Sequence, residues 1–214
     1  MIRNIVFDMG GVLVDYEADL VCRHFIKDEA LREKIRTDVF VSPEWVMLDM
    51  GVISEEEGLR RMQARLASEE EKRLAAECFL HWHEYNMWPV EGMKEEIEKL
   101  KDRGFGVYLC SNASVRLLTC YKEIIPGIRL FDGILFSAEE KCIKPQKEIY
   151  ERLFEKFRLK PEECFFIDDV QLNIDGAAAC GMKGCCHDGD VKKLKALLDS
   201  FPSPGSTAGQ DEAG

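Results

Sequence analysis

Short apolar segments that stop at polar residues recur along this chain, and stretches with helical periodicity separate them. Such runs, bounded by glycine or polar residues, are typical of buried strands. The five predicted strands occupy 5–7, 106–110, 133–136, 164–167 and 184–187. Strands that alternate with helices form βαβ units, which build a parallel sheet. The fold is therefore predicted to be α/β, with a Rossmann-like parallel sheet core and helices on both faces.

The long segment between the first two predicted strands, 15–88, contains no strand pattern. Apolar residues recur there three to four positions apart, as on the buried face of a helix. The Ser-Glu-Glu-Glu sequences beginning at Ser54 and Ser68 have the form of capping boxes and predict two helix starts. Around Trp45 the periodicity fails, and an irregular link is expected. This segment is predicted to be entirely helical.

These patterns predict two modules with a discontinuous boundary. An α/β core is formed by residues 1–14 and 89–200, and an all-helical cap, 15–88, is inserted after its first strand. The last residues, 201–214, are rich in Pro, Gly and Ser and lack periodic apolar positions, so they are expected to be a disordered tail.

Charge and cysteine content exclude several classes of protein. The chain has 214 residues and a formal net charge of −11. This acidic balance argues against nucleic acid or a membrane surface as partner, since either needs a basic footprint. No apolar run approaches the roughly 20 residues of a membrane span, and the short N-terminal run lacks the form of a signal peptide. Nine cysteines without a signal peptide favour reduced thiols and a cytoplasmic protein.

The densest cysteine cluster comprises Cys180, Cys185, Cys186 and His187. Cys185 and Cys186 are adjacent and would face opposite ways on a strand, and the usual spacing of zinc ligands is absent. A zinc site is not expected there. Buried structural thiols are the preferred interpretation.

Polar side chains follow three of the predicted strands, and a lysine lies in a loop nearby. Because parallel strands share one carboxyl edge, these groups are expected to converge: Asp8, Ser111, Asn112, Lys144, Asp168 and Asp169. Magnesium prefers carboxylate and phosphate oxygens, and an ammonium group neutralises a transferring phosphoryl group. Asp8 alone is compatible with a nucleophile, a metal ligand or a turn cap. The whole set favours a site for Mg²⁺ and a phosphate.

In these residues the chain resembles the haloacid dehalogenase-like (HAD) hydrolase superfamily, in its helical-cap phosphatase group. Four motifs occur in the family's order: Phe7-Asp8-Met9-Gly10-Gly11-Val12, Cys110-Ser111-Asn112, Lys144-Pro145 and Phe166-Ile167-Asp168-Asp169. The segment Asn173–Ala177 also resembles the family's sequel to its acidic pair. Each motif is common by itself, whereas four in order at strand ends or loops are not.

The resemblance implies a role for each matched residue. Asp8 would be the nucleophile that forms an aspartyl-phosphate. Magnesium would bind Asp8, the Gly10 carbonyl and Asp169, with a phosphate oxygen, while Asp168 and Asn173 would orient metal-bound waters or the Asp169 carboxylate. Phosphate would be held by Ser111 and Lys144 and by backbone N–H groups around Gly11 and Asn112.

Gly10 departs from the family's common pattern, which has a second Asp there as general acid and base. General acid–base catalysis contributes about 10²–10⁴-fold, so its loss requires an explanation. Three explanations compete. Another group, such as Asp15 or a cap residue, would supply the proton, or the leaving group would be weakly basic, as an anomeric sugar hydroxyl is. In the third, the protein would turn over its substrate inefficiently. The Gly-Gly variant of the motif resembles a subset that includes sugar-phosphate phosphatases.

The favoured function is a Mg²⁺-dependent phosphatase acting on a small phosphomonoester, with a sugar phosphate as the preferred class. A metal-independent 2-haloacid dehalogenase and a catalytically weak protein that binds a phosphometabolite or a protein are the alternatives. Trp45, Trp82 and Trp88 are interpreted as core residues rather than ligand contacts. Cap hinges are predicted near Asp15 and Trp88–Pro89. A monomer or a homodimer is expected.

Overall fold

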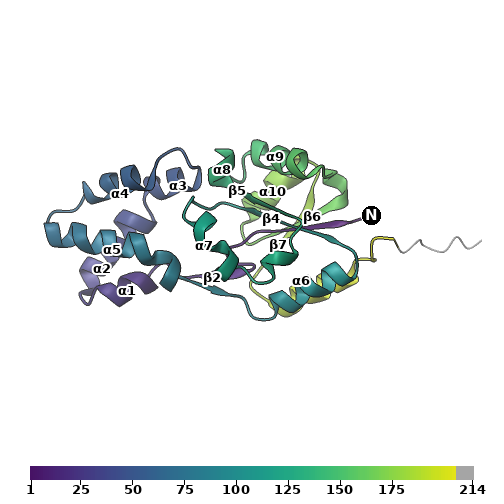
Figure 1. The fold of residues 1–214 in the computed structure, drawn as a ribbon, viewed down its shortest axis with the longest axis horizontal. Coiled ribbons are helices and arrows are strands. Elements are labelled where there is room, and N and C mark those ends of the chain that lie inside the picture. The colour runs from purple at the N-terminus through teal and green to yellow at the C-terminus, as the bar shows by residue number, and fades with distance from the viewer. Residues whose placement is uncertain (206–214) are drawn as a thin grey trace, which may run out of the picture.

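The computed structural model describes residues 1–205, and its core is a five-stranded sheet in the order β5-β4-β1-β6-β7 (Figure 1). Every neighbouring pair in this sheet is parallel. Its strands are β1 (Asn4–Phe7), β4 (Gly106–Ser111), β5 (Gly133–Phe136), β6 (Cys164–Asp168) and β7 (Lys183–Cys186). The predicted α/β fold with a parallel sheet is confirmed.

Strand register brings the predicted motifs to one edge of the sheet. The central strand β1 pairs with β4 and β6, and Phe7 lies opposite both Leu109 and Ile167. Asp8 follows directly, so it lies between the ends of its two neighbours. The carboxyl edge of a parallel sheet is where open α/β folds bind ligands.

Helices cover both faces of the sheet. The central strand points apolar side chains to both faces in turn, and each face needs a covering layer. Ile5 and Phe7 contribute to one hydrophobic cluster, and Val6 to another on the opposite face. The first face is covered by α6 (Met93–Asp102), α7 (Leu117–Ile124) and α11 (Val191–Ser200). The second is covered by α9 (Lys147–Phe157) and α10 (Gln171–Ala179). Short helices complete the core: η1 (Ile128–Leu130), α8 (Ser137–Glu140) and η2 (Pro161–Glu163).

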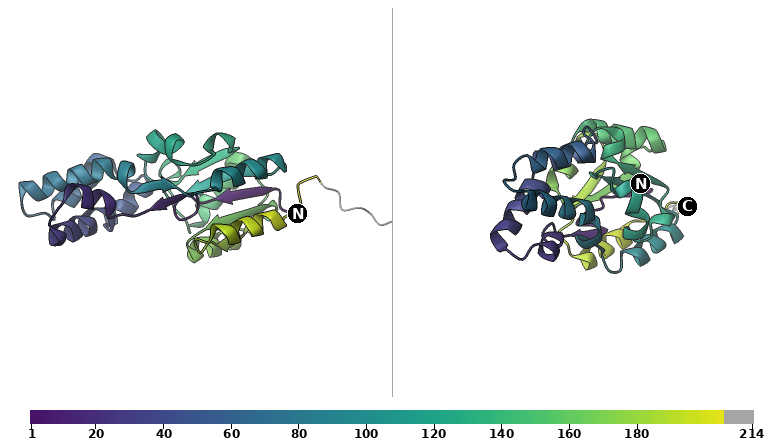
Figure 2. Two further views of the ribbon diagram at one scale, coloured as in Figure 1. Left: turned by 90° about the horizontal axis from the view of Figure 1, so that it is seen from below. Right: turned by 60° about the vertical axis from the view of Figure 1, so that its left-hand side comes forward.

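Five of the six helices between β1 and β4 form a bundle at one end of the molecule (Figures 1 and 2), which we call the cap. They are α1 (Leu20–Phe25), α2 (Glu29–Phe40), α3 (Pro43–Asp49), α4 (Glu55–Gln63) and α5 (Glu69–Tyr85). Ser54 and Ser68 cap α4 and α5 as predicted, accepting from the N–H of Glu57 and Glu71. The irregular link predicted around Trp45 is wrong, because Ser42 caps a short helix there.

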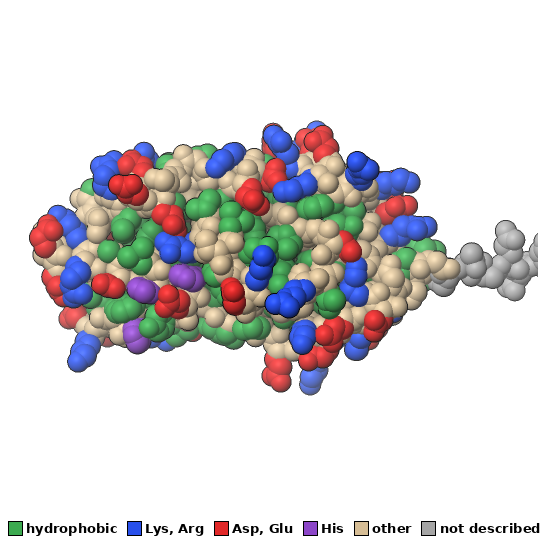
Figure 3. Space-filling model, in the orientation of Figure 1, with side chains coloured by type: hydrophobic (Ala, Val, Ile, Leu, Met, Phe, Trp, Pro, Cys, Tyr) green, Lys and Arg blue, Asp and Glu red, His purple; other side chains and the backbone are tan. Residues whose placement is uncertain are grey.

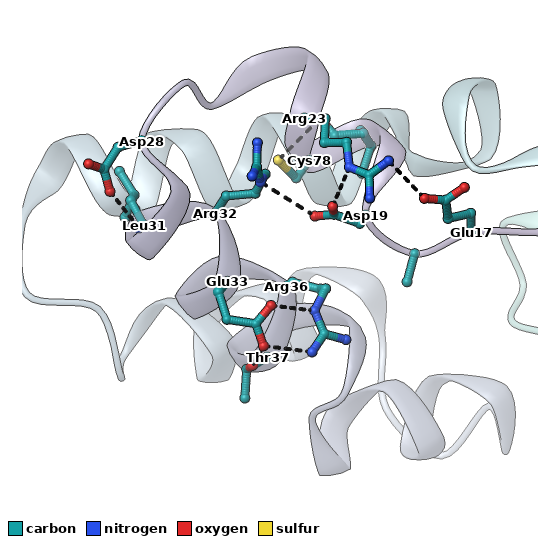
Figure 4. A network of polar contacts seen from close by, with 12 residues as sticks. Glu17, Asp19, Arg23, Asp28, Leu31, Arg32, Glu33, Arg36, Thr37 and Cys78 are labelled. Atoms are coloured by element: carbon teal, nitrogen blue, oxygen red, sulfur yellow. Dashed lines mark hydrogen bonds and ion pairs between the residues drawn. The ribbon is translucent and has the colours of Figure 1, made fainter.

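Ion pairs on the surface of α1 and α2 connect residues close in sequence (Figure 4). Arg23 pairs with Glu17 at 3.0 Å and with Asp19 at 2.5 Å, and Arg36 pairs with Glu33 at 2.7 Å. Such partly exposed pairs contribute about 0.2–1 kcal/mol each. The apolar interior, where Trp82 and Phe79 of α5 are buried, therefore provides most of the stability of the cap.

A two-stranded antiparallel ribbon joins the cap to the core, and this corrects the prediction that 15–88 is entirely helical. β2 (Val14–Tyr16) pairs with β3 (Met87–Pro89), with Asp15 opposite Trp88. A strand of three residues is too short to produce a periodic pattern, and Pro89 obscures it further. The two predicted hinge positions thus lie opposite each other in one ribbon.

The N-terminus lies at the end of the molecule far from the cap (Figure 2). Phe201, the first residue assigned to the tail, instead packs its ring on Phe165 at 4.9 Å between centroids. Arg103 donates to the carbonyl oxygens of Leu198 and Phe201. The rest of the predicted tail from 206 onward lies outside the described residues.

Acidic and basic side chains are interspersed on the face seen in Figure 3, where no extended basic patch is present. Within residues 1–205, no helix is long and apolar enough to cross a membrane. All nine cysteines are free, but Cys180 and Cys185 are half-buried and Cys186 is exposed. The interpretation of this cluster as buried thiols is therefore wrong, since it lies at and near the edge strand β7.

Candidate active site

A buried lysine connects two carboxylates at the carboxyl edge of the sheet. Lys144 Nζ lies 2.8 Å from Asp8 Oδ1 and 2.6 Å from Asp168 Oδ2, and all three residues are buried. Buried charges persist only when they are paired and hydrogen-bonded. Lys144 thus compensates the desolvation of two carboxylates that β1 and β6 place side by side.

Asp168 has its hydrogen-bonding capacity filled by protein donors. Asn173 Nδ2 donates to both of its oxygens at 2.9 and 3.1 Å, and the N–H of Val170 donates to Oδ1 at 2.8 Å. Tyr150 holds the backbone of Asn173 in turn, through a 2.6 Å hydrogen bond to its carbonyl oxygen. Asp168 is therefore occupied in positioning Lys144.

Asp169 differs from its neighbour, because it is exposed and, within residues 1–205, its carboxylate accepts only from its own backbone N–H and forms no ion pair. Oxygens of Asp8, Asp168 and Asp169 lie within 4.8 Å of one another. A hard cation prefers such oxygen donors, and it would offset the repulsion among them. The residues therefore fit the magnesium ion that the sequence predicts.

Two glycines form the turn beside this acidic group. Gly11 has φ +66°, and a Cβ there would overlap the carboxylate of Asp169. Around Gly10 a Cβ would meet no atom within 4 Å. The turn closes by hydrogen bonds from the N–H of Gly11 to the Val14 carbonyl and from the N–H of Val14 to the Met9 carbonyl, each 2.9 Å. Glycine at position 11 allows backbone to approach Asp169 closely.

Ser111 and Asn112 follow β4 and have different partners. Ser111 is buried, and its side chain hydrogen-bonds to Asp8. The side chain of Asn112 instead binds the backbone of Lys144, accepting from its N–H at 2.8 Å and donating to its carbonyl at 3.0 Å. Asn112 thus fixes the loop that carries the lysine, and only its backbone N–H remains for the predicted phosphate contact.

Burial and the neighbouring charges together set the pKa values of these groups. Burial and the Asp168 carboxylate raise the pKa of Asp8 to about 6, although Lys144 and Ser111 oppose the shift. Burial by itself would lower the pKa of Lys144, but the Asp8 and Asp168 carboxylates outweigh it and raise that pKa above its ordinary value. Burial and Asp168 also raise the pKa of Asp169. Lys144 therefore stays charged in the folded protein.

A cavity of about 360 Å³ opens above Asp8, between the core and the cap. Core residues Ser111, Ser114 and Leu117 form one side of it. The other side comes from the ribbon and the cap and consists of Asp15, Tyr16, Trp45, Asp49, Trp82 and Met87. Among residues 1–205, no lysine or arginine lines this cavity. The upper part of the pocket is therefore mainly aromatic and apolar. The floor, which is the part around Asp8, Asn112 and Asp169, is polar.

Six residues of this pocket were missed by the sequence analysis: Tyr16, Asp49, Met87, Ala113, Ser114 and Leu117. Their positions depend on how the cap folds back over the core, which no local pattern encodes. Trp45 and Trp82 line the cavity besides packing in the cap, so interpreting them only as core was incomplete. Trp88 does not line it and is exposed.

Comparison with known proteins assigns the family. Residues 2–181 match the model of the haloacid dehalogenase-like hydrolases, and the chain belongs to that family. A sesquiterpene phosphatase of Aspergillus oryzae is 26% identical over 85% of this chain and 88% of its own length. A D-ribitol-5-phosphate phosphatase of Bacteroides thetaiotaomicron is 27% identical, covering 81% of this chain and 86% of the relative.

Solved structures share the fold. A predicted HAD-like hydrolase from Porphyromonas gingivalis superposes with a TM-score of 0.72 at 24% identity, over 94% of this chain and all of that one. A HAD-family enzyme of Bacteroides thetaiotaomicron, in complex with magnesium and inorganic phosphate, gives a TM-score of 0.69 at 22% identity. The match covers 91% of this chain and 99% of the other. The parallel sheet with its inserted helices is therefore the HAD fold.

Proposed function

We propose that this protein is a Mg²⁺-dependent phosphatase that hydrolyses a small phosphomonoester through an aspartyl-phosphate at Asp8. The observation that carries the proposal is the arrangement of charges around Asp8. Lys144 holds one of its oxygens at 2.8 Å, and the carboxylate of Asp169, which forms no ion pair with a described residue, lies on the same edge of the sheet. Relatives in the family that act as phosphatases support the same reaction class.

Magnesium would be held by Asp8, Asp169 and the carbonyl of Gly10, and would supply positive charge opposite the transferring phosphoryl group. The structure of a relative with magnesium and inorganic phosphate supports this assignment. Asp168 and Asn173 keep Lys144 and the adjacent backbone in place. They act by orienting other groups rather than by contacting substrate.

The reaction follows from the chemistry of the floor. A carboxylate oxygen of Asp8 attacks phosphorus, the ester P–O bond breaks, and the leaving alcohol takes up a proton. Water then attacks the aspartyl-phosphate, which releases phosphate and restores Asp8. Lys144, Ser111 and the backbone N–H of Asn112 neutralise the phosphoryl oxygens in both steps, whereas the N–H of Gly11 already donates to the Val14 carbonyl.

The cavity bears on the substrate. A sugar phosphate remains the favoured class, since its volume suits a cavity of about 360 Å³ and a polyol-phosphate phosphatase is among the relatives. The aromatic wall of Trp45 and Trp82 with Met87 favours a second candidate, an ester with an apolar body. The sesquiterpene phosphatase relative supports that candidate. A leaving group that carries further negative charge does not fit this cavity, because the wall is apolar and none of the described residues that line it is a lysine or an arginine.

The two alternatives from the sequence fit less well. A dehalogenase needs no metal, and Asp169 would then be a charge without a partner in a crowded acidic group. A protein that only binds phosphometabolites has no need of a nucleophile supported by a buried lysine.

The test is phosphate release from a panel of sugar, terpenyl and aryl phosphates, with Mg²⁺ and with EDTA. We expect release only with Mg²⁺ and a loss of more than about 10³-fold in Asp8→Asn, which removes the nucleophile. Asp102→Asn is the matched control, because Asp102 is exposed at the end of α6, before the opposite edge of the sheet. Halide release from 2-haloacids without metal, or no turnover of any ester, would overturn the proposal.

A further inference from the structure

The family's usual acid is absent at Gly10, yet the leaving alcohol of a phosphate ester needs a proton. Of the carboxylates that line the cavity, Asp8 and Asp169 belong to the floor, and Asp15 and Asp49 come from the ribbon and the cap. Asp15 is exposed on β2. Asp49 is half-buried at the end of α3, beside Trp45, where the cap meets the core.

Contacts around Asp49 fix it against the loop that carries part of the floor. Its backbone carbonyl accepts a 2.5 Å hydrogen bond from Ser137 Oγ, and its carboxylate accepts from the backbone N–H of Ser114. Ser114 lies three residues after Ser111 and lines the same cavity. The cap thus places a carboxylate over the loop that follows β4.

We propose that Asp49 is the general acid and base of this phosphatase and replaces the carboxylate missing at Gly10. This inference rests on the proposed function. In the first step the ester P–O bond breaks as Asp8 attacks, and the leaving oxygen takes the proton of Asp49. In the second step the Asp49 carboxylate takes a proton from a water molecule as the oxygen of that water attacks phosphorus. The Asp8–phosphorus bond breaks, and both residues return to their starting states.

The surroundings of Asp49 suit an acid that acts near neutral pH. Burial raises its pKa to about 7, and the Ser114 hydrogen bond opposes this only in part. Within residues 1–205, no lysine or arginine forms an ion pair with Asp49. Tyr16 interacts with it, and the carboxylates of Asp8, Asp15 and Asp169 line the same cavity. Nearby cations are engaged elsewhere, Lys141 with the Gly51 carbonyl and Arg116 with Glu55.

The test compares leaving groups. An acid matters most when the departing oxygen is strongly basic, and least for p-nitrophenolate. We expect Asp49→Asn to lower kcat/KM about 10²–10³-fold for the best alkyl phosphate of the panel, and less than about 10-fold for p-nitrophenyl phosphate. Asp49→Glu, which keeps an acid, should recover part of the alkyl rate. In the wild type, kcat/KM for the alkyl ester should fall as pH rises through about 7. Asp49→Asn should lack this limb.

Stability gives a second readout that does not depend on turnover. Because the folded pKa of Asp49 lies above that of an unfolded aspartate, its stabilising effect is complete below about pH 4. It is lost as pH rises toward about 7. Relative to the neutral Asp49→Asn variant, the wild type should therefore lose thermal stability between these values and remain level above them. Variants that fail to fold would be detected in the same melting curves.

The outcomes separate the two proposals. If neither the wild type nor the Asp102→Asn control releases phosphate from any ester, the proposed function fails. If the wild type is active but Asp49→Asn lowers both esters equally, Asp49 acts through structure or binding and the assignment is overturned. The same holds if Asp15→Asn, and not Asp49→Asn, produces the leaving-group-dependent loss.

Discussion

At the residue scale, the turn after β1 shows how two adjacent glycines carry different requirements. Gly11 has a left-handed backbone and touches Asp169, whereas Gly10 has open space where a side chain would be. The absence of a carboxylate at position 10 therefore does not reflect a lack of room. The open space beside Gly10 is compatible with the proposal that Asp49 of the cap delivers the proton to the leaving alcohol.

Substituting each glycine by alanine tests this difference. Gly11→Ala should destabilise the protein by about 1–3 kcal/mol, since alanine resists a positive φ, and its Cβ would also displace Asp169. Gly10→Ala, as the matched control, should cost less because it meets no neighbour. Urea unfolding measures both. Equal losses of stability would show that the close approach to Asp169 is unimportant.

The residues around Asp8 were largely predictable, because Asp8 and Asp168 stand at strand ends whose register the fold determines, and Lys144 and Asn173 belong to motifs near those ends. Asp8, Lys144, Asp168 and Asn173 do come together in the structure. The use of the Asn112 side chain to hold the Lys144 backbone was not foreseen, since a loop contact leaves no periodic signal. Asp49 could not be found either, because its position depends on packing between modules. The catalytic and metal-binding roles stay predictions.

At the element scale, the contact between cap and core is concentrated at the end of α3 and the start of α4. Arg116, in the loop before α7, forms a bidentate pair with Glu55, at 2.8 and 3.0 Å. Ser137 and Lys141 bind the backbone of Asp49 and Gly51. These contacts hold the wall of the cavity closed, while the β2–β3 ribbon is the covalent connection and the predicted hinge.

Breaking the Glu55–Arg116 pair should loosen that closure. We expect Arg116→Ala and Glu55→Gln each to raise KM several-fold with a smaller effect on kcat, because neither residue lines the cavity above Asp8. In the double variant the effects should be less than additive, as for residues in direct contact. Fully additive effects on KM, or no effect, would contradict a role of this pair in closure.

Secondary structure illustrates the same limit of sequence reasoning. The core strands and the capped helices α4 and α5 were predicted because their patterns are local. The ribbon strands β2 and β3 have three residues each and are stabilised by pairing across the whole insertion. Long-range pairing of short segments leaves too little periodicity to detect.

At the scale of the whole molecule, a metal that binds only the folded state should stabilise it. Three carboxylates within 4.8 Å repel one another when no cation is bound. Mg²⁺ at 100 times its dissociation constant should add about 2.7 kcal/mol of stability, seen as a rise in Tm that EDTA reverses. Asp169→Asn should abolish most of the rise. An equal rise in that variant would place the ion elsewhere.

The central claim is that Asp8 carries the phosphoryl group during turnover. The most direct measurement is acid quenching of the enzyme during hydrolysis of its best ester with Mg²⁺, followed by peptide mapping by mass spectrometry. The account predicts one phosphoryl group on the peptide that contains Asp8, which is absent when ester is omitted and in Asp8→Asn. Hydrolysis by Asp8→Asn at the wild-type rate, or a phosphoryl group on another residue, would contradict it.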